Sequence, residues 1–399
     1  MEMLRAWEEA YAPIAEANHL KVLRAFRESK ISAEAFHGST GYGYQDFGKR
    51  KLEELYTRIF KGKAALVSGR FASGTHAIHV VLRGILDPGD CLVSMTGHLY
   101  DTLEKALAHP RGLLHRDGVI YRRIEMHPQT GLDLDAIEKG ALSGVKAVMV
   151  QRSRGYSQRK ALSIAEIANL KAVMSVYAPD TLLIVDNCYG EFVEAQEPLE
   201  AGADIIVGSL IKNPGGTLAV SGAYVVSNRE GILESVADAF TVPGIGDEIG
   251  WESGENLRLM FQGLYLAPGF VEESLKSAEY AAIRLSQAGY EVSPKPGDHR
   301  GDIIQSILLQ EPEKLVRFIQ GIQAYSPVDS QVRPIPWDMP GYDHPVIMAS
   351  GSFIGGSSSE LSADAPIRPP FAAYLQGGVR FHYSKAAIDM ALEGIQDDL

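Results

Sequence analysis

The chain has 399 residues, of which 45% are hydrophobic and 22% are charged, so it has enough material for one large globular domain or two smaller ones. Its formal net charge of −12 argues against a nucleic-acid partner, because phosphate backbones require clustered Lys and Arg. The two cysteines form no CxxC pair, so neither a disulfide framework nor a structural metal site is expected.

Residues 2–30 predict helices, because apolar side chains recur near helical spacing, beginning with Leu4, Trp7 and Tyr11. The segment is charged throughout and lacks the apolar centre of a signal peptide. No run approaches the roughly 18 uninterrupted apolar residues that suggest a membrane span. We therefore expect a cytoplasmic protein with no membrane partner. The polar, glycine- and tyrosine-rich stretch that follows, residues 37–50, predicts a loop.

Short apolar runs then alternate with amphipathic stretches from Lys63 to Asn228. The predicted strands are AALVSG (64–69), CLVSM (91–95), AVMV (147–150), TLLIVD (181–186), DIIVGS (204–209) and GAYVVS (222–227). The predicted helices lie near 75–86, 101–108, 133–140 and 164–177. Such alternation indicates an α/β fold with a mostly parallel sheet covered by helices on both faces.

The chain changes character after about residue 260. Helices are predicted near 254–287, and residues 291–385 form a mixed segment rich in Pro and Gly, which we interpret as part of a smaller α+β domain. The predicted organisation is an N-terminal arm and loop (1–50), a large domain (51–260) and a small C-terminal domain (261–399).

An acid and a lysine follow two successive predicted strands. Asp186 ends the run TLLIVD, and Lys212 follows DIIVGS within GSLIKNPGG. In an open α/β sheet, ligands bind beyond the carboxyl ends of the strands, so both side chains can reach one small ligand. A carboxylate stabilises a protonated pyridine nitrogen and a lysine amine forms an imine with an aldehyde, a combination that suits pyridoxal phosphate. The alternatives are a helix cap or turn for Asp186 and a solvated surface amine for Lys212.

A phosphate site is predicted where Ser73, Gly74 and Thr75 precede an amphipathic helix, because free backbone N–H groups and the helix dipole attract anions there. An ordinary helix N-cap is the alternative. Ser209, at the end of another predicted strand, is placed to add a hydroxyl to the same phosphate. Tyr100 follows the run CLVSM and is a candidate to stack on a planar cofactor, with a half-buried structural tyrosine as the alternative.

Six motifs, in order along the chain, carry a resemblance to a known family. They are SGTHA, TGHLYDTLE, VDNCYGEF, GSLIKNPGG, QGLYLAP and ELSADAPIRPPF. Together they resemble the methionine γ-lyase-like branch of the Cys/Met-metabolism pyridoxal-phosphate enzymes, whose members are often labelled cystathionine β-lyase-like or aluminium-resistance proteins. The likeness runs from about residue 38 to 390. It implies the fold type I (aspartate-aminotransferase-like) architecture, in which a seven-stranded, mostly parallel sheet is joined to a smaller C-terminal domain.

The resemblance implies roles for the residues already singled out. Lys212 would hold the cofactor covalently as a Schiff base and move the Cα proton of the substrate. Asp186 would pair with the pyridine nitrogen, and Tyr100 would stack on the ring and assist proton transfer.

The resemblance also implies that Gly74, Thr75 and Ser209 hold the phosphate. In the wider γ-lyase family a Tyr/Arg pair from the neighbouring subunit reaches this phosphate, and Tyr44 stands where that tyrosine would be. The arginine has no direct match, and Arg50 is its candidate replacement. A homotetramer, built as a dimer of dimers with shared active sites, is implied.

A substrate carboxylate usually needs an arginine. The candidates are Arg368, in the IRPP motif, and Arg380, in GGVRFHYSK, with surface or structural ion pairs as the alternatives. The segment GGVRFHYSK departs from the pattern we expect of this branch, which bears on substrate choice. Arg152 and Arg154 follow a predicted strand and are further candidates to line the entrance, with a structural salt bridge as the alternative.

We therefore predict a pyridoxal-phosphate-dependent lyase that acts on a small amino acid by β- or γ-elimination, or by γ-replacement, with loss of a thiol. Elimination of a halide from a chlorinated unsaturated amino acid to form an alkyne is a second reading. An aminotransferase on the same fold, a non-catalytic cofactor-binding stress protein and a nucleotide-binding α/β protein are the remaining alternatives. The sequence does not choose the leaving group.

Overall fold

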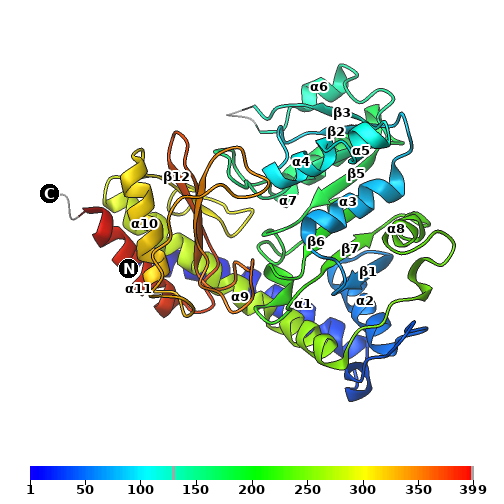
Figure 1. Ribbon diagram of the computed structural model, residues 1–399, viewed down its shortest axis with the longest axis horizontal. Helices are drawn as coiled ribbons and strands as arrows, with labels where there is room; N and C mark the ends of the chain where they lie inside the picture. Colours follow the sequence, from blue (N-terminus) through cyan, green and yellow to red (C-terminus); the bar gives the residue numbers. More distant parts are fainter. Residues whose placement is uncertain (128–130, 397–399) are drawn as a thin grey trace.

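The computed structural model describes residues 1–127 and 131–396, which form a large and a small sheet flanked by helices (Figure 1). The helices are α1 Glu2–Glu28, α2 Phe47–Phe60, α3 Gly74–Ile85, α4 Asp101–Ala108, α5 Leu113–Arg116, α6 Leu134–Glu138, α7 Ile164–Tyr177, α8 Ile232–Phe240, α9 Gly254–Gln287, α10 Pro312–Ala324 and α11 Phe381–Gln396. Short 3-10 helices, η1 to η3, span Ala33–Phe36, Asn213–Gly215 and Gly246–Glu248.

The large sheet has seven strands in the order β1-β7-β6-β5-β4-β2-β3. The strands are β1 Ala64–Ser68, β2 Cys91–Ser94, β3 Ile120–Arg123, β4 Ala147–Gln151, β5 Leu182–Asp186, β6 Ile205–Ser209 and β7 Ala223–Ser227. Only β7 runs opposite to its neighbours, pairing antiparallel with both β1 and β6. The mostly parallel, seven-stranded sheet that the resemblance implied is therefore confirmed.

Both faces of the large sheet are buried, because successive side chains along each strand enter two different hydrophobic clusters. In β5, for example, Leu183 and Val185 pack with residues of α2, α7 and α9, whereas Ile184 packs with residues of α3, α4 and α8. This double coverage explains why the strands are continuous apolar runs in the sequence.

The parallel strands bring their carboxyl ends to one edge of the sheet. The ends of β2, β4, β5 and β6 are each followed by a residue or loop that carries polar or charged side chains. Since β5 pairs with both β4 and β6, the residues after these three strands lie next to one another. This edge faces the small domain (Figure 1).

The small domain holds a five-stranded antiparallel sheet, in the order β10-β11-β12-β9-β8. Its strands are β8 Glu291–Ser293, β9 Gln305–Leu308, β10 Val346–Ala349, β11 Ser362–Pro366 and β12 Ala372–Gln376. One face packs on α10, α11 and the end of α9. The other face carries Ala372 and Tyr374, which pack with Tyr156 and Tyr189 of the large domain.

Helix α9 connects the two sheets, and α1 packs along it (Figure 1). The helix expected within residues 2–30 is one continuous helix with Pro13 inside it. The loop expected over 37–50 is shorter than predicted: α2 already begins at Phe47, because Asp46 caps it by accepting a hydrogen bond from the backbone N–H of Lys49.

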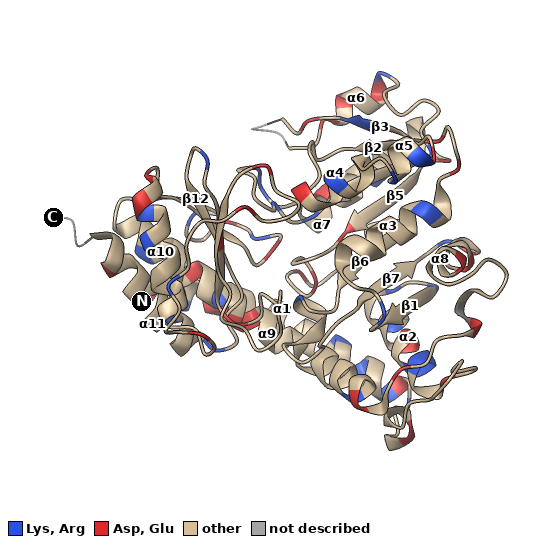
Figure 2. Ribbon diagram, viewed as in Figure 1, with Lys and Arg blue, Asp and Glu red and all other residues tan. Residues whose placement is uncertain are grey.

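Positions of Lys and Arg and of Asp and Glu are scattered over the ribbon, mostly on helices and loops (Figure 2). Among the described residues, no helix is both long and apolar enough to cross a membrane. In the same described part of the chain, no group of three or more His, Cys, Asp or Glu side chains is placed to hold a metal ion.

Candidate active site

Lys212 lies at the junction of the two domains. It follows β6 and precedes η2, so it extends from the carboxyl edge of the large sheet. Its Nζ donates hydrogen bonds to the Tyr189 hydroxyl at 2.6 Å and to the Ser358 hydroxyl at 3.1 Å. Tyr189 belongs to the loop after β5, and Ser358 to the small domain, so both domains hold this amine.

The charge state of Lys212 follows from these neighbours. Burial by itself lowers the pKa of this amine. The Tyr189 phenol opposes burial through its charge and its hydrogen bond, and Asp364 of β11 adds a smaller effect in the same direction. Together they leave the pKa of Lys212 above its ordinary value, so the free amine is protonated at neutral pH.

The turn after Lys212 is fixed by glycines that leave no room for a side chain. A Cβ on Gly215 would lie 1.7 Å from the carbonyl oxygen of Leu210. Gly216 has a φ of +50°, and a Cβ there would lie 2.0 Å from the carbonyl oxygen of Gly263 in α9. The glycines of the NPGG sequence therefore let this turn pack directly on the α9 backbone. This packing fixes the backbone position from which the Lys212 side chain extends.

Asp186 is the last residue of β5 and is only 6% exposed. It accepts a hydrogen bond from the backbone N–H of Cys188 at 3.2 Å. Burial raises the pKa of this carboxyl above its ordinary value, although the bond from Cys188 acts in the opposite direction. Among the described residues no cationic side chain forms an ion pair with Asp186, so a protonated ring nitrogen would find an unpaired carboxylate there.

The residues expected to hold a phosphate lie around the start of α3. Ser73 caps this helix by accepting a hydrogen bond from the backbone N–H of His76 at 3.1 Å. The next residue, Gly74, approaches Ser209 so closely that a Cβ would lie 3.3 Å from the Ser209 Cβ. Thr75 follows on the same helical turn. The structure thus brings β6 and the N-terminus of α3 together, as an anion site between them requires.

Tyr100 stands immediately before α4, and its hydroxyl donates to the Thr75 hydroxyl at 3.0 Å. Its backbone N–H donates to the side chain of Gln151, the last residue of β4. Burial, and then the charge of Asp186, raise the pKa of Tyr100 well above its usual range. The phenol is therefore protonated at neutral pH in the ligand-free protein, and the raised pKa makes it a weaker acid than a free tyrosine.

The residues Tyr189, Ser358 and Asp364 belong to this site but were not predicted from the sequence. Tyr189 lies within DNCYGEF, and its positive φ of 68° is a conformation that a bulky residue rarely adopts. Asp364 accepts a hydrogen bond from the Gln376 amide at 2.9 Å, and burial raises the pKa of its carboxyl. Only the small-domain sheet brings Asp364 to Lys212, and the sequence gives no direct signal for that contact.

Other predicted residues are not brought to Lys212 within one chain. Tyr44 is 63% exposed, and the centroid of its ring lies 5.5 Å from that of the Tyr42 ring, with the two ring planes tilted relative to each other. Arg50 is exposed and donates to the backbone carbonyl of Gln45. Arg380 is exposed just before α11. Arg368, after β11, is half-buried. Burial raises the pKa of Tyr374, and the charge of Arg368 acts in the opposite direction.

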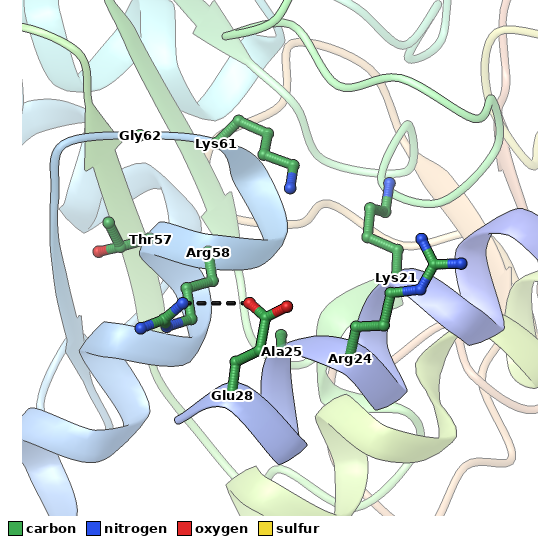
Figure 3. A pocket seen from close by; sticks show the side chains of 8 residues that line it. All are labelled: Lys21, Arg24, Ala25, Glu28, Thr57, Arg58, Lys61 and Gly62. Atoms are coloured by element: carbon green, nitrogen blue, oxygen red, sulfur yellow. Dashed lines mark hydrogen bonds and ion pairs between the residues drawn. The ribbon is translucent and has the colours of Figure 1, made fainter. Parts of the chain in front are cut away.

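A separate pocket lies between α1 and α2 (Figure 3). Its lining includes Lys21, Arg24, Lys61 and the ion pair between Arg58 and Glu28, whose atoms are 3.1 Å apart. None of these residues belongs to the site around Lys212. The pocket is a basic surface hollow, and nothing in it suits amino-acid chemistry.

A seven-stranded, mostly parallel sheet with a lysine and an acid at its carboxyl edge, facing a smaller C-terminal domain, defines the fold type I class of pyridoxal-phosphate enzymes. Within that class the chain belongs to the methionine gamma-lyase family, which matches residues 2–396. Enzymes of this family use pyridoxal phosphate. The fold and the family expected from the sequence are both confirmed.

Several relatives extend over nearly the whole chain. An uncharacterized protein of Bacillus subtilis is 43% identical over 386 residues, which cover 96% of this chain and 91% of that protein. The crystal structure of a carbon-sulfur lyase involved in aluminum resistance, from Clostridium novyi, has a TM-score of 0.94 at 42% identity and covers 99% of this chain and 94% of that one. An L-methionine gamma-lyase of Pseudomonas deceptionensis is 24% identical over 61% of this chain and 59% of its own length.

A more distant structure shares the fold. An O-acetylhomoserine (thiol)-lyase structure from Campylobacter jejuni contains a pyridoxyl-lysine monophosphate residue; it has a TM-score of 0.62 at 16% identity and covers 90% of this chain and 88% of that one. This likeness shows the fold. The residues of the present chain also fit the group on their own geometry: a half-buried amine, an unpaired buried carboxylate, and a helix N-terminus where Gly74 leaves room beside Ser209.

Proposed function

We propose that this chain is a carbon-sulfur lyase that holds pyridoxal phosphate covalently on Lys212 and carries out β- or γ-elimination on an amino acid. The observation that carries the proposal is the position of the Lys212 amine. It is half-buried between the two domains, at the same sheet edge as Asp186 and the N-terminus of α3. The family and the carbon-sulfur lyase from Clostridium novyi support the choice of reaction.

Each residue has a role in this proposal. The cofactor, when bound, supplies an electron sink that acidifies the Cα proton of an amino acid. Asp186 holds a proton at the pyridine nitrogen, while Gly74, Thr75 and Ser209 hold the phosphate. Lys212 Nζ takes the Cα proton once it is free and neutral.

Tyr100 completes the proposed reaction. Its phenol is protonated in the ligand-free protein, where burial and the charge of Asp186 raise its pKa. For its hydroxyl to give a proton to the departing thiolate, a protonated ring nitrogen beside Asp186 must offset that charge and lower the pKa of the phenol. The Tyr189 hydroxyl, 2.6 Å from Lys212 Nζ, orients that amine. The small domain adds the Ser358 hydroxyl and the Asp364 carboxylate around the same amine.

We also propose a homotetramer with shared active sites. Aromatic side chains gather on one exposed part of the surface, where Gly43 lies against the Trp251 backbone and Tyr42, Tyr44 and Trp251 are 70%, 63% and 48% exposed. A second copy that covers them would bring Tyr44 toward its phosphate site. Sedimentation equilibrium tests this assembly, and a monomer at micromolar concentration would contradict it.

A substrate panel tests the reaction. The purified, cofactor-loaded protein is incubated with cystathionine, methionine, homocysteine, cysteine, O-acetylhomoserine and chlorinated amino acids, and products are followed by mass. We expect a 2-oxo acid, ammonia and a thiol from at least one sulfur amino acid, with the aldehyde form of the cofactor regenerated. Release of chloride alone would favour the halide reading, accumulation of pyridoxamine phosphate would show an aminotransferase, and no turnover would indicate a binding protein.

A further inference from the structure

Three buried arginines, Arg152, Arg154 and Arg300, lie near the junction of the two domains. They differ in the hydrogen-bond partners of their guanidinium groups. Arg152 is fully buried, and its guanidinium bonds to Asn187, to the Gly190 carbonyl and to Glu194. Arg300, 6% exposed, bonds in the same way to Glu279 and Gln305. A buried guanidinium normally requires such partners, because the loss of hydration is costly otherwise.

Arg154 has none of these partners. It is 3% exposed, and its Nε and Nη1 are buried without a hydrogen-bond partner. Among the described residues its guanidinium forms no ion pair. The carboxylate that attracts it, Asp302, is already engaged: one oxygen accepts from the Ser153 hydroxyl and the Arg154 backbone N–H, and the other from the Ile304 backbone N–H. Burial accordingly lowers the pKa of Arg154.

The position of Arg154 connects it to Lys212 through aromatic side chains. Arg154 lies in the loop after β4, at the edge of the sheet that bears the site. Burial raises the pKa of Tyr374 in β12, and the charge of Arg154 acts in the opposite direction. The centroid of the Tyr374 ring lies 5.3 Å from that of the Tyr156 ring. Tyr156 and Tyr189 pack in the same cluster as Tyr374, and the Tyr189 hydroxyl contacts Lys212. Arg154 and Lys212 therefore line the same junction between the domains.

We propose that Arg154 binds the carboxylate of the amino-acid substrate. This inference rests on the proposed function and names the residue that anchors its substrate. A guanidinium can grip a carboxylate with two parallel N–H groups, from Nη1 and Nη2 or from Nε and Nη2. Each of these pairs contains one of the Arg154 nitrogens that have no hydrogen-bond partner, Nη1 and Nε. The two arginines favoured from the sequence are less buried than Arg154: Arg380 is exposed just before α11, and Arg368 is half-buried.

Ligand binding to the cofactor-loaded protein tests the inference without turnover. The probes are L-alanine, which has no leaving group, and L-alaninamide, which lacks the carboxylate. Their dissociation constants are read from the change in cofactor absorbance. The wild-type protein should bind alanine about 30-fold or more tightly than alaninamide, since losing one partner of a buried charged pair has an effect of at least this size. Arg154→Met should reduce this ratio to near one, and Arg154→Lys should keep part of it.

The outcomes separate the two claims. If the wild-type protein shows no cofactor absorbance, or no change with either amine, the proposed function fails. If the wild-type protein responds but Arg154→Met keeps the alanine preference, only the assignment to Arg154 fails. Loss of the preference in Arg368→Gln or Arg380→Gln, with Arg154→Met unchanged, would move the anchor to that arginine and overturn the inference.

Thermal stability of the ligand-free protein gives a second readout, with Arg152→Met as the matched control. Arg154 gives up hydration without gaining partners, so Arg154→Met should leave the melting temperature unchanged or raise it. Arg152→Met should lower it by several degrees, because it leaves Glu194 and Asn187 without their partner. An equal loss in both variants would mean that Arg154 is structural and would overturn the inference.

Discussion

At the scale of single residues, the site depends on how one amine is held. Lys212 contacts a phenol from the large domain and a hydroxyl from the small domain, and Asp364 adds a negative charge from the small-domain sheet. Tyr189 and Asp364 favour the protonated amine, whereas burial disfavours it. The balance is set by side chains that are far apart in the sequence.

Removing these groups should lower the pKa of Lys212. In Tyr189→Phe the largest opposing influence is lost and burial remains, so the pKa of the free amine should fall below its wild-type value. Asp364→Asn should lower it by less. The measurement is the pH dependence of Lys212 acetylation in cofactor-free protein, read by mass spectrometry. An unchanged profile in Tyr189→Phe would show that the short contact between Tyr189 and Lys212 does not govern the charge of the amine.

Much of the site was visible in the sequence because its residues lie directly after apolar runs. Asp186 and Ser209 are the last residues of β5 and β6, where the rule about strand ends predicted them, and Gly74 begins α3, where the rule about anions at helix N-termini predicted it. Tyr189, Ser358 and Asp364 were missed. Their contacts arise from the packing of two domains, which no local pattern encodes, although the DNCYGEF motif already contained Tyr189.

At the scale of elements, the turn that follows Lys212 requires small residues. Gly215→Ala would place a Cβ 1.7 Å from the Leu210 carbonyl oxygen, so the turn between Leu210 and Ala219 would have to rearrange. We expect a loss of roughly 3 kcal/mol or more in the free energy of unfolding, together with weaker cofactor retention. Chemical denaturation and the cofactor absorbance measure the two effects.

Gly394→Ala is the matched control for this variant. Gly394 lies in α11 with open space where its Cβ would be. Alanine there should stabilise the protein by about 0.5–1 kcal/mol, because glycine is unfavourable within a helix. Equal stability of the two variants would contradict the role assigned to the turn.

The sequence predicted the elements best where periodicity was strong and burial complete. Helices α4, α7 and α9 coincide with the predicted ranges, and each of the six predicted runs contains a strand. Strand β3, Ile120–Arg123, was missed because it is largely exposed at the edge of the sheet and carries two arginines. Helix α2 was missed because its first turn follows a loop-like stretch, and its cap, Asp46, was not recognised.

At the scale of the whole molecule, the two domains are also joined by a titratable contact. His299, in the connection between β8 and β9, lies 3.3 Å from Glu194 of the large domain. The hydrogen bond with Glu194 raises the pKa of His299, while the pKa of Glu194 itself is lowered, with burial opposed by His299 and Arg152. Glu194 therefore stays ionised while His299 titrates.

This contact should make domain docking depend on pH. Because the pKa of His299 is raised in the folded protein, its contribution to stability is fully present below the unfolded pKa of about 6.5. That contribution is lost as the pH rises through the pKa of His299 in the folded protein. His299→Gln should therefore be less stable than the wild-type protein at about pH 6, by less than about 1 kcal/mol because the imidazole is largely exposed, and equally stable at alkaline pH. Melting curves across this range test the sign, and a difference that grows with pH would contradict it.

The central claim concerns one covalent bond, between Lys212 and the cofactor. The most direct measurement is borohydride reduction of the cofactor-loaded protein, followed by proteolysis and mass spectrometry of the peptides. The reduced pyridoxyl adduct should be found on the peptide that contains Lys212, and Lys212→Ala should lose both the adduct and the visible absorbance. An adduct on another lysine, or a Lys212→Ala protein that keeps its colour and its adduct, would contradict the account.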